Sequence, residues 1–178
     1  MMKSYQDRAA AFIQQGDVAR ERGRTDEAIR AYREAIGLVP AYGTLHLTIA
    51  DLLLQAGRFF EAAAAYQDAA AHSPENDRAW TGLGLCRLRL ENHADALAAF
   101  RSALAANPQN PEANYYSALL LGMQGELKEA EEKLIHALRQ RPDWEIQARR
   151  EASLKPVFEG SKRFEGPGKP RKWWGLRK

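Results

Sequence analysis

The fold of this chain is decided by a stretch of 34 residues, which at positions 77–110 reads DRAWTGLGLCRLRLENHADALAAFRSALAANPQN. Its proline, Pro108, has counterparts 34 residues apart along the chain, at Pro40, Pro74 and Pro142. Counting back from each proline defines four repeats, and a fixed period of this length is the signature of a repeat architecture. The four repeats are residues 9–42, 43–76, 77–110 and 111–144.

An apolar pattern recurs at fixed distances before each proline. Alanine stands 12 and 5 residues before it, and a large apolar residue stands 8 before it. This i, i+4, i+7 spacing predicts one buried face of a helix. A small residue 24 positions before each proline would let a first helix approach a second closely. The members are Ala28, Tyr32 and Ala35; Ala62, Tyr66 and Ala69; Ala96, Phe100 and Ala103; Ala130, Leu134 and Ala137; and the small residues Gly16, Ala50, Gly84 and Ala118.

Helix-ending residues separate the two halves of each repeat. Three repeats have Gly23, Gly57 or Gly125 at the same position, where a left-handed residue would end the first helix. The third repeat has Glu91 followed by Asn92, and we expect the asparagine to adopt that conformation. Each proline then ends a second helix, so eight helices are predicted. Amphipathic helices in an ordinary bundle would give no reason for such punctuation to recur at 34 residues.

The third repeat carries a recognisable motif. It reads W-x2-L-G from Trp80 to Gly84, then A-x3-F-x2-A from Ala96 to Ala103, and then Pro108. This pattern resembles the tetratricopeptide repeat (TPR) family. The other repeats match more loosely; repeat four, for example, has Asn114 at the tryptophan position. The resemblance implies an all-α fold, a right-handed superhelical solenoid of antiparallel helix pairs, and a non-catalytic scaffold that binds another protein or a peptide segment in its concave face.

The resemblance also implies which side chains line that face, namely six positions on the first helix of each repeat. Its first half is polar with mixed charge, whereas its second half offers apolar and aromatic side chains of the kind that anchor a peptide. The same aromatic side chains could instead pack against a neighbouring repeat or the C-terminal segment. The expected partner-binding residues are Thr44, Leu47, Thr48, Asp51, Arg78, Thr81, Leu85, Arg89, Tyr115, Tyr116 and Leu119.

One well-known use of the family, the carboxylate clamp on a chaperone C-terminus, does not fit this sequence. Ile13 and Asp17 stand where the clamp has Lys and Asn, and its second-repeat Asn is Thr48. Only Arg78 keeps a basic charge, and the two aspartates Asp17 and Asp51 would repel a terminal carboxylate. The sequence therefore disfavours a chaperone adaptor of that kind.

The ends of the chain lack the repeat signature. Residues 1–8 form an N-terminal extension, and residues 145–164 begin as a capping helix in which Ile146 and Leu154 are expected to cover the last repeat. Residues 165–178 mix Gly and Pro with basic residues, which predicts a disordered tail. The net charge of +3 hides this asymmetry, because residues 161–178 contain seven Lys or Arg and one Glu.

The tail offers an alternative function, a membrane-recruited adaptor. Tryptophan beside lysine suits the interface of an anionic membrane, and it suits single-stranded nucleic acid less well here. A solvated tail without a ligand stays open as well. The residues for such peripheral contact are Lys169, Arg171, Lys172, Trp173, Trp174, Arg177 and Lys178.

Nothing in the sequence points to catalysis. The single cysteine, Cys86, has no partner at metal-ligand spacing and is expected to be buried and inert, and the four histidines form no metal-binding pair. There is no phosphate-binding loop or nucleophile motif. We therefore expect no enzyme activity, no metal and no cofactor. Without a signal peptide or an apolar stretch of membrane-spanning length, we expect a cytoplasmic protein. Self-association through an end of the solenoid also stays open.

Overall fold

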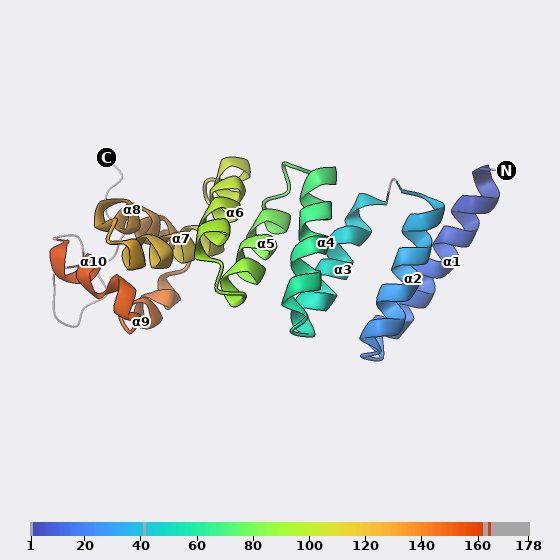
Figure 1. Ribbon diagram of the computed structural model, residues 1–178, viewed down its shortest axis with the longest axis horizontal. Coiled ribbons are helices and arrows are strands. Elements are labelled where there is room, and N and C mark those ends of the chain that lie inside the picture. The colour runs from blue at the N-terminus through green and yellow to red at the C-terminus, as the bar shows by residue number, and fades with distance from the viewer. Residues whose placement is uncertain (1, 41, 162–163, 165–178) are drawn as a thin grey trace. The chain divides into compact units, whose positions relative to one another are not determined.

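The computed structural model describes residues 2–40, 42–161 and 164, and every regular element in that part of the chain is helical. The chain forms two compact units, an N-terminal unit up to Ala99 and a C-terminal unit from Phe100 onward. The eight predicted helices are confirmed and follow one another as four pairs (Figure 1). They are α1 (Met2–Glu21) and α2 (Thr25–Leu38), α3 (Gly43–Gln55) and α4 (Phe59–His72), α5 (Asp77–Arg89) and α6 (His93–Ala106), and α7 (Pro111–Gln124) and α8 (Leu127–Gln140).

The predicted apolar stripes form the core of the helix pairs. The alanines and the large apolar residue before each proline are all buried, and Tyr32, Phe100 and Leu134 have no exposed surface. The small residues of the first helices are buried as well. In repeat one, a Cβ atom on Gly16 would lie 2.5 Å from the ring of Tyr32. Helices α1 and α2 therefore approach as closely as the small residue predicts.

The turn between the paired helices requires a left-handed residue at the position found from the sequence. Gly23, Gly57 and Gly125 have φ angles of 71°, 72° and 80°. In repeat three, Glu91 adopts this conformation with φ 59°, so the expectation that Asn92 would do so is wrong. The left-handed conformation is therefore kept at this position of all four repeats, although the residue is not always glycine. Asn92 has another role, because its side chain donates to Asp95 at 2.7 Å at the start of α6.

Two different side chains make the same contact with the proline of the preceding repeat. The indole nitrogen of Trp80 donates to the carbonyl oxygen of Pro74 at 2.8 Å. The amide nitrogen of Asn114, at the tryptophan position of repeat four, donates to the carbonyl oxygen of Pro108 at 3.0 Å. The replacement therefore keeps the hydrogen bond that ties the start of a repeat to the turn before it. Asn110 also caps α7, accepting from the Ala113 backbone N–H at 2.8 Å.

The C-terminal segment, residues 142–161, is built from short pieces rather than one capping helix. These are η1 (Pro142–Trp144), α9 (Glu145–Ala148), η2 (Ala152–Leu154) and α10 (Lys155–Gly160). Leu154 is fully buried as expected, but Ile146 is 68% exposed, so its predicted role is wrong. Helix α9 lasts only one turn, and Ala148 takes its buried position instead.

The N-terminal surface of α1 differs from the matching surface of the inner repeats. Ile49 and Leu83 are buried on α3 and α5, and the corresponding residue of α1 is the exposed Gln15. A cleft of about 490 Å³ lies here between α1 and α2, with Val18 and Arg22 also in its wall. The polar Gln15 thus replaces an apolar side chain that the inner repeats bury, whereas the apolar Val18 is 38% exposed in the same cleft.

Candidate functional site

We call the ligand face the side chains at positions 2, 5, 6, 9, 12 and 13 of each repeat, which the TPR resemblance assigns to partner binding. In repeats two and three, Thr44, Arg78 and Arg89 are exposed. Thr81 is buried, and its hydroxyl donates to the backbone carbonyl of Asp77 at 2.7 Å. Thr81 therefore supports the helix instead of offering a contact. The remaining predicted residues of these repeats are partly exposed, and they are Leu47, Thr48, Asp51 and Leu85.

Two aspartates of the ligand face are held by tyrosines of the second helices. The Tyr32 hydroxyl donates to Asp17 at 2.7 Å, and the Tyr66 hydroxyl donates to Asp51 at 2.5 Å. Both rings are buried, so each hydroxyl reaches the face from inside the helix pair. Burial, and then the hydrogen bond to the aspartate, raises the pKa of Tyr32 to about 12 and the pKa of Tyr66 further still.

These pairs were missed by the sequence analysis, which placed the tyrosines in the core and the aspartates on the face. A signal was present, because each pair spans 15 residues in the same register of its repeat. A carboxylate fixed by a hydrogen-bonded tyrosine has less rotational freedom than a free surface side chain. The two aspartates are therefore oriented before any ligand arrives.

Arginine side chains accompany both aspartates. Arg78 at the start of α5 contacts Asp51 of α3 at 3.0 Å, and Arg20 contacts Asp17 at 3.3 Å. The Arg78 side chain is 68% exposed and the Asp51 side chain 32%, so solvent screens the pair and its net contribution to folding is small. The face of repeats two and three thus presents an accessible, oriented pair of opposite charges.

The ligand face of repeat four is different, because other parts of the C-terminal unit cover it. Tyr115 is only 4% exposed, and its ring packs edge-on against Trp144 with centroids 5.2 Å apart. Tyr116 stacks on Phe100 at 5.6 Å and remains partly exposed, as does Leu119. The expectation that Tyr115 is available to a partner is therefore wrong, and the alternative that it packs against the C-terminal segment is correct.

A second contact brings the C-terminal segment against α7. A Cβ atom on Gly122 would lie 2.3 Å from the carbonyl oxygen of Ser153. The backbone of η2 therefore rests directly on the helix at a ligand-face position that only glycine can fill. Leu154 is buried beside it, Val157 is buried in α10, and the Ser161 hydroxyl donates to Glu131 of α8 at 2.6 Å.

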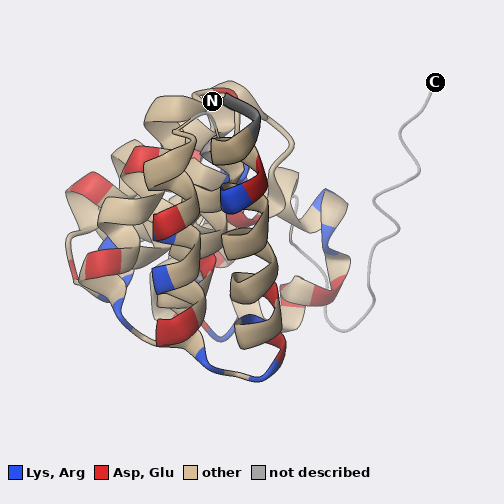
Figure 2. Cartoon of the chain, turned by 90° about the vertical axis from the view of Figure 1, so that its right-hand side faces the viewer, with Lys and Arg blue, Asp and Glu red and all other residues tan. Residues whose placement is uncertain are grey.

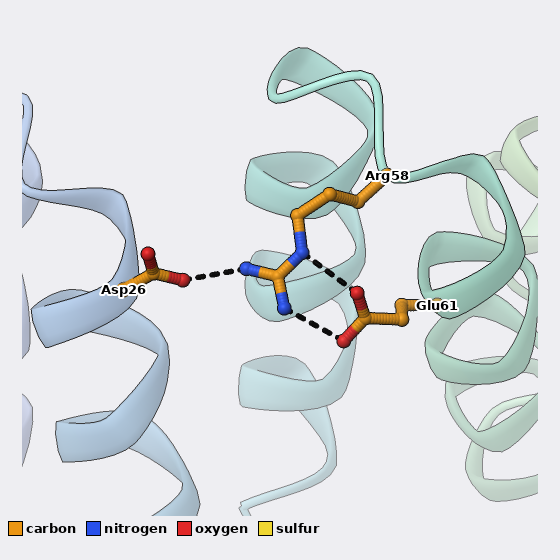
Figure 3. A network of polar contacts seen from close by, with 3 residues as sticks. All are labelled: Asp26, Arg58 and Glu61. Carbon is orange, nitrogen blue, oxygen red and sulfur yellow. Dashed lines mark hydrogen bonds and ion pairs between the residues drawn. The ribbon is translucent and has the colours of Figure 1, made fainter.

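A charged network joins repeats one and two at the turns between paired helices. Arg58 contacts Asp26 at 2.5 Å and binds Glu61 through two nitrogens, each at 2.7 Å (Figure 3). Glu61, and then Asp26, raises the pKa of the Arg58 guanidinium, and Arg58 lowers the pKa of Glu61. Figure 2 shows acidic and basic positions interspersed along the helices rather than separated by sign. The network is a surface contact between repeats, and it defines no binding site by itself.

The described part of the chain contains one free cysteine, which is buried, and no cluster of metal-ligating side chains. No three His, Cys, Asp or Glu side chains there come together to hold a metal ion. Cys86 is fully buried as expected, and burial raises the pKa of its thiol to about 11, which keeps it protonated at neutral pH. Of the helices in residues 2–40 and 42–161, none has the length and apolar character to cross a membrane. The predicted contact residues of the tail, from Lys169 to Lys178, lie outside the described residues.

Similar solved structures support the same fold. The crystal structure of MamA protein matches with a TM-score of 0.76 and 21% identity, covering 86% of this chain and 82% of that one. The first TPR of Spaghetti (RPAP3), bound to the HSP90 peptide SRMEEVD, has a TM-score of 0.60 and 21% identity, with coverages of 67% and 95%. YrrB, a TPR protein with an unusual peptide-binding site, has a TM-score of 0.64 and 19% identity, with coverages of 83% and 84%.

A family model identifies the repeats directly. No curated protein sequence matches the chain significantly. The model of the cilia and flagella-associated protein 70 C-terminal domain, a TPR domain, matches residues 2–143, which include all four helix pairs. The chain therefore belongs to the tetratricopeptide-repeat family described as the cilia and flagella-associated protein 70 C-terminal domain.

Proposed function

We propose that this protein is a non-catalytic scaffold that binds a segment of another protein along the ligand face of repeats two and three. The observation that carries the proposal is the accessible pair of Asp51 and Arg78, held in place by the buried Tyr66. Oriented charges beside partly exposed apolar residues such as Leu47 and Leu85 give both direction and contact area to a bound segment.

Similar structures provide a precedent for this use of the fold. One TPR neighbour was solved with a bound peptide, and another is described by its peptide-binding site. The peptide in the first case, SRMEEVD, is acidic at its end. Asp17 and Asp51 disfavour such a ligand here, because two like charges would face it. We therefore propose a partner segment that is not acidic and that pairs with Asp51 while Arg78 donates to backbone carbonyl oxygens of the partner.

The experiment is affinity capture from native lysate with mass spectrometry, using the full chain. The test variant combines Thr44→Glu with Arg89→Glu, two exposed residues of the ligand face. The control variant combines Gln67→Glu with Arg30→Glu, two exposed residues of the second helices, and changes the charge by the same amount. We expect a captured protein to be lost with the test variant and retained with the control.

The two variants also separate the proposal from general charge effects. Both should keep the helical circular dichroism and unfolding midpoint of the wild type, since the changed residues are exposed. If every captured protein survives the test variant in folded form, or if the control loses the same proteins, the ligand face of repeats two and three is not the binding surface.

A further inference from the structure

The C-terminal segment covers part of the ligand face of repeat four. It touches α7 at two ligand-face positions, through Trp144 on Tyr115 and through the Ser153 carbonyl on Gly122. One contact is an aromatic anchor, and the other is a direct approach of backbone to helix. A bound peptide uses the same two kinds of contact, a buried aromatic residue and a closely packed main chain.

We propose that the ligand face of repeat four is a peptide-binding surface that residues 142–161 occupy in cis. The outside partner would be a short segment that carries a tryptophan and a hydrogen-bond acceptor, and it would replace the chain's own segment. This inference concerns the C-terminal unit alone, so it stands or falls separately from the function proposed for repeats two and three.

Residues 142–161, the cis segment, have as little regular structure of their own as a bound peptide. Its four pieces contain 3, 4, 3 and 6 residues, and isolated helices of such length are not stable in water. Its order therefore depends on the few side chains that it buries, chiefly Leu154 and Val157. Elements held by few contacts open at lower free energy than the core of the same protein.

The cis segment also leaves a hydrogen-bond donor of the ligand face, the Tyr115 hydroxyl, without an acceptor in the described part of the chain. The Tyr115 hydroxyl is buried and, within the described residues, makes no hydrogen bond. Burial, and then the field of Glu151, raises the pKa of Tyr115 to about 12, so the hydroxyl stays a donor. A competing segment that places a carbonyl or carboxylate oxygen against this donor gains an interaction that residues 142–161 do not make.

Gly122 explains why a backbone rather than a side chain rests here. Any Cβ atom at this position would collide with the Ser153 carbonyl, and that atom cannot move without moving the segment. The surface therefore selects a segment whose backbone can contact Gly122 directly. Substitution at Gly122 should abolish binding of every such segment, whether in cis or in trans.

The test uses the full chain and a fluorescent synthetic peptide of residues 141–161, RPDWEIQARREASLKPVFEGS. In the opened variant, Leu154→Asp removes the buried anchor of the cis segment and leaves α7 and α8 unchanged. We expect the peptide to bind this variant at least about tenfold more tightly than the wild type, because apparent affinity falls with the fraction of molecules whose surface is open. Adding Gly122→Ala to the opened variant, or Trp144→Ala to the peptide, should remove the gain.

Controls keep the outcome decisive. Circular dichroism must show helices in each variant, and Val157→Asp provides a second opened variant if Leu154→Asp unfolds the protein. Equal peptide affinity for the wild type and both opened variants would overturn the proposal, as would binding that survives Gly122→Ala. A wild-type dimer that dissociates in the opened variants would also overturn it, because the occupant would then be the segment of a second copy.

Discussion

The first two repeats and the last two differ at one position of the first helix and one position of the second helix, which are polar in the former and apolar in the latter. In repeats one and two, these positions hold the hydrogen-bonded pairs Asp17–Tyr32 and Asp51–Tyr66. In repeats three and four they hold Leu85 with Phe100 and Leu119 with Leu134. Each repeat forms two helices and buries the second-helix residue, so the core requires only the bulk of that residue. The tyrosine hydroxyl adds a different feature, an oriented carboxylate on the ligand face.

The largest expected effect comes from breaking the packing that supports the pair in repeat two. A Cβ atom on Gly82 would lie 2.3 Å from the ring of Tyr66. We expect Gly82→Ala to lower the free energy of unfolding by about 2–3 kcal/mol, since the buried ring cannot move aside easily. Urea unfolding followed by circular dichroism measures the change.

Gly37→Ala is the matched control for this substitution. A Cβ atom on Gly37 would meet nothing within 4 Å, and the residue lies inside α2. We expect this variant to be as stable as the wild type or more stable by about 0.5–1 kcal/mol. Equal destabilisation by both substitutions would show that the loss at Gly82 is not caused by Tyr66.

The next effect converts repeat two into the apolar type. Tyr66→Phe should cost about 1.5 kcal/mol, because the hydrogen bond to a charged acceptor is lost. Asp51→Leu should cost a similar amount, because it leaves the Tyr66 hydroxyl without its acceptor. The double variant should lose less than the sum by about 1 kcal/mol, since it recreates the residue types that repeat three has at these positions, Leu85 and Phe100. Additive losses in urea unfolding would mean that the pair is not coupled.

Repeat three offers a smaller and stabilising change. Glu91 has a φ of 59° where the other three repeats have glycine, and this conformation costs a residue with a side chain roughly 1 kcal/mol. We therefore expect Glu91→Gly to raise the free energy of unfolding by about that amount. The reverse change, Gly57→Glu, should lower it comparably, and a thermal melt of each variant gives the comparison. A neutral result at both positions would contradict the strain assigned to Glu91.

The smallest expected effect is a dependence on pH that belongs to repeat two. The rings of His46 and His72 stack 4.6 Å apart, and burial, and then His72, lowers the pKa of His46. A lowered histidine pKa means that the unfolded chain binds the proton more readily. The free energy of unfolding is then at its full value above the ordinary histidine pKa. It declines as the pH falls through the lowered pKa of His46, by at most about 1.4 kcal/mol per pH unit for one proton.

Urea titrations at a series of pH values between 5 and 8 test this dependence. His46→Gln should flatten the decline without removing the helices. The carboxylates with lowered pKa, Glu61 and Asp143, lose their contribution only at more acidic pH, so they do not enter this window. An unchanged slope in His46→Gln would assign the pH dependence to another group.

The fold could be predicted from the sequence because its determinants are local and periodic. The prolines, the alanine stripes and the glycines fixed the helices and the turns between them. Where a repeat departs from the pattern, the backbone geometry is still the same, since Asn114 reproduces the hydrogen bond of Trp80 and Glu91 adopts the left-handed conformation of the glycines. A repeat position thus carries a geometric requirement that more than one residue can meet.

The ligand face was less predictable, because its accessibility depends on contacts outside the repeat pattern. Tyr115 occupies a ligand-face position, yet Trp144, the last residue of repeat four, covers it. Ile146 was expected to be buried on apolar character alone, although its one-turn helix buries Ala148 instead. The pairing of Tyr66 with Asp51 was also missed, since period alone does not show which side chains point toward one another.

The polar surface of α1 determines how this array could be made longer. A helix pair added before α1 would have to bury Gln15 and Arg22, which are exposed in the present chain. A second copy of residues 43–76 inserted after the first would instead repeat packing that α3 already makes through Ile49. Designers who extend the protein should therefore duplicate an inner repeat, because a helix pair placed before α1 would have to bury the polar side chain of Gln15.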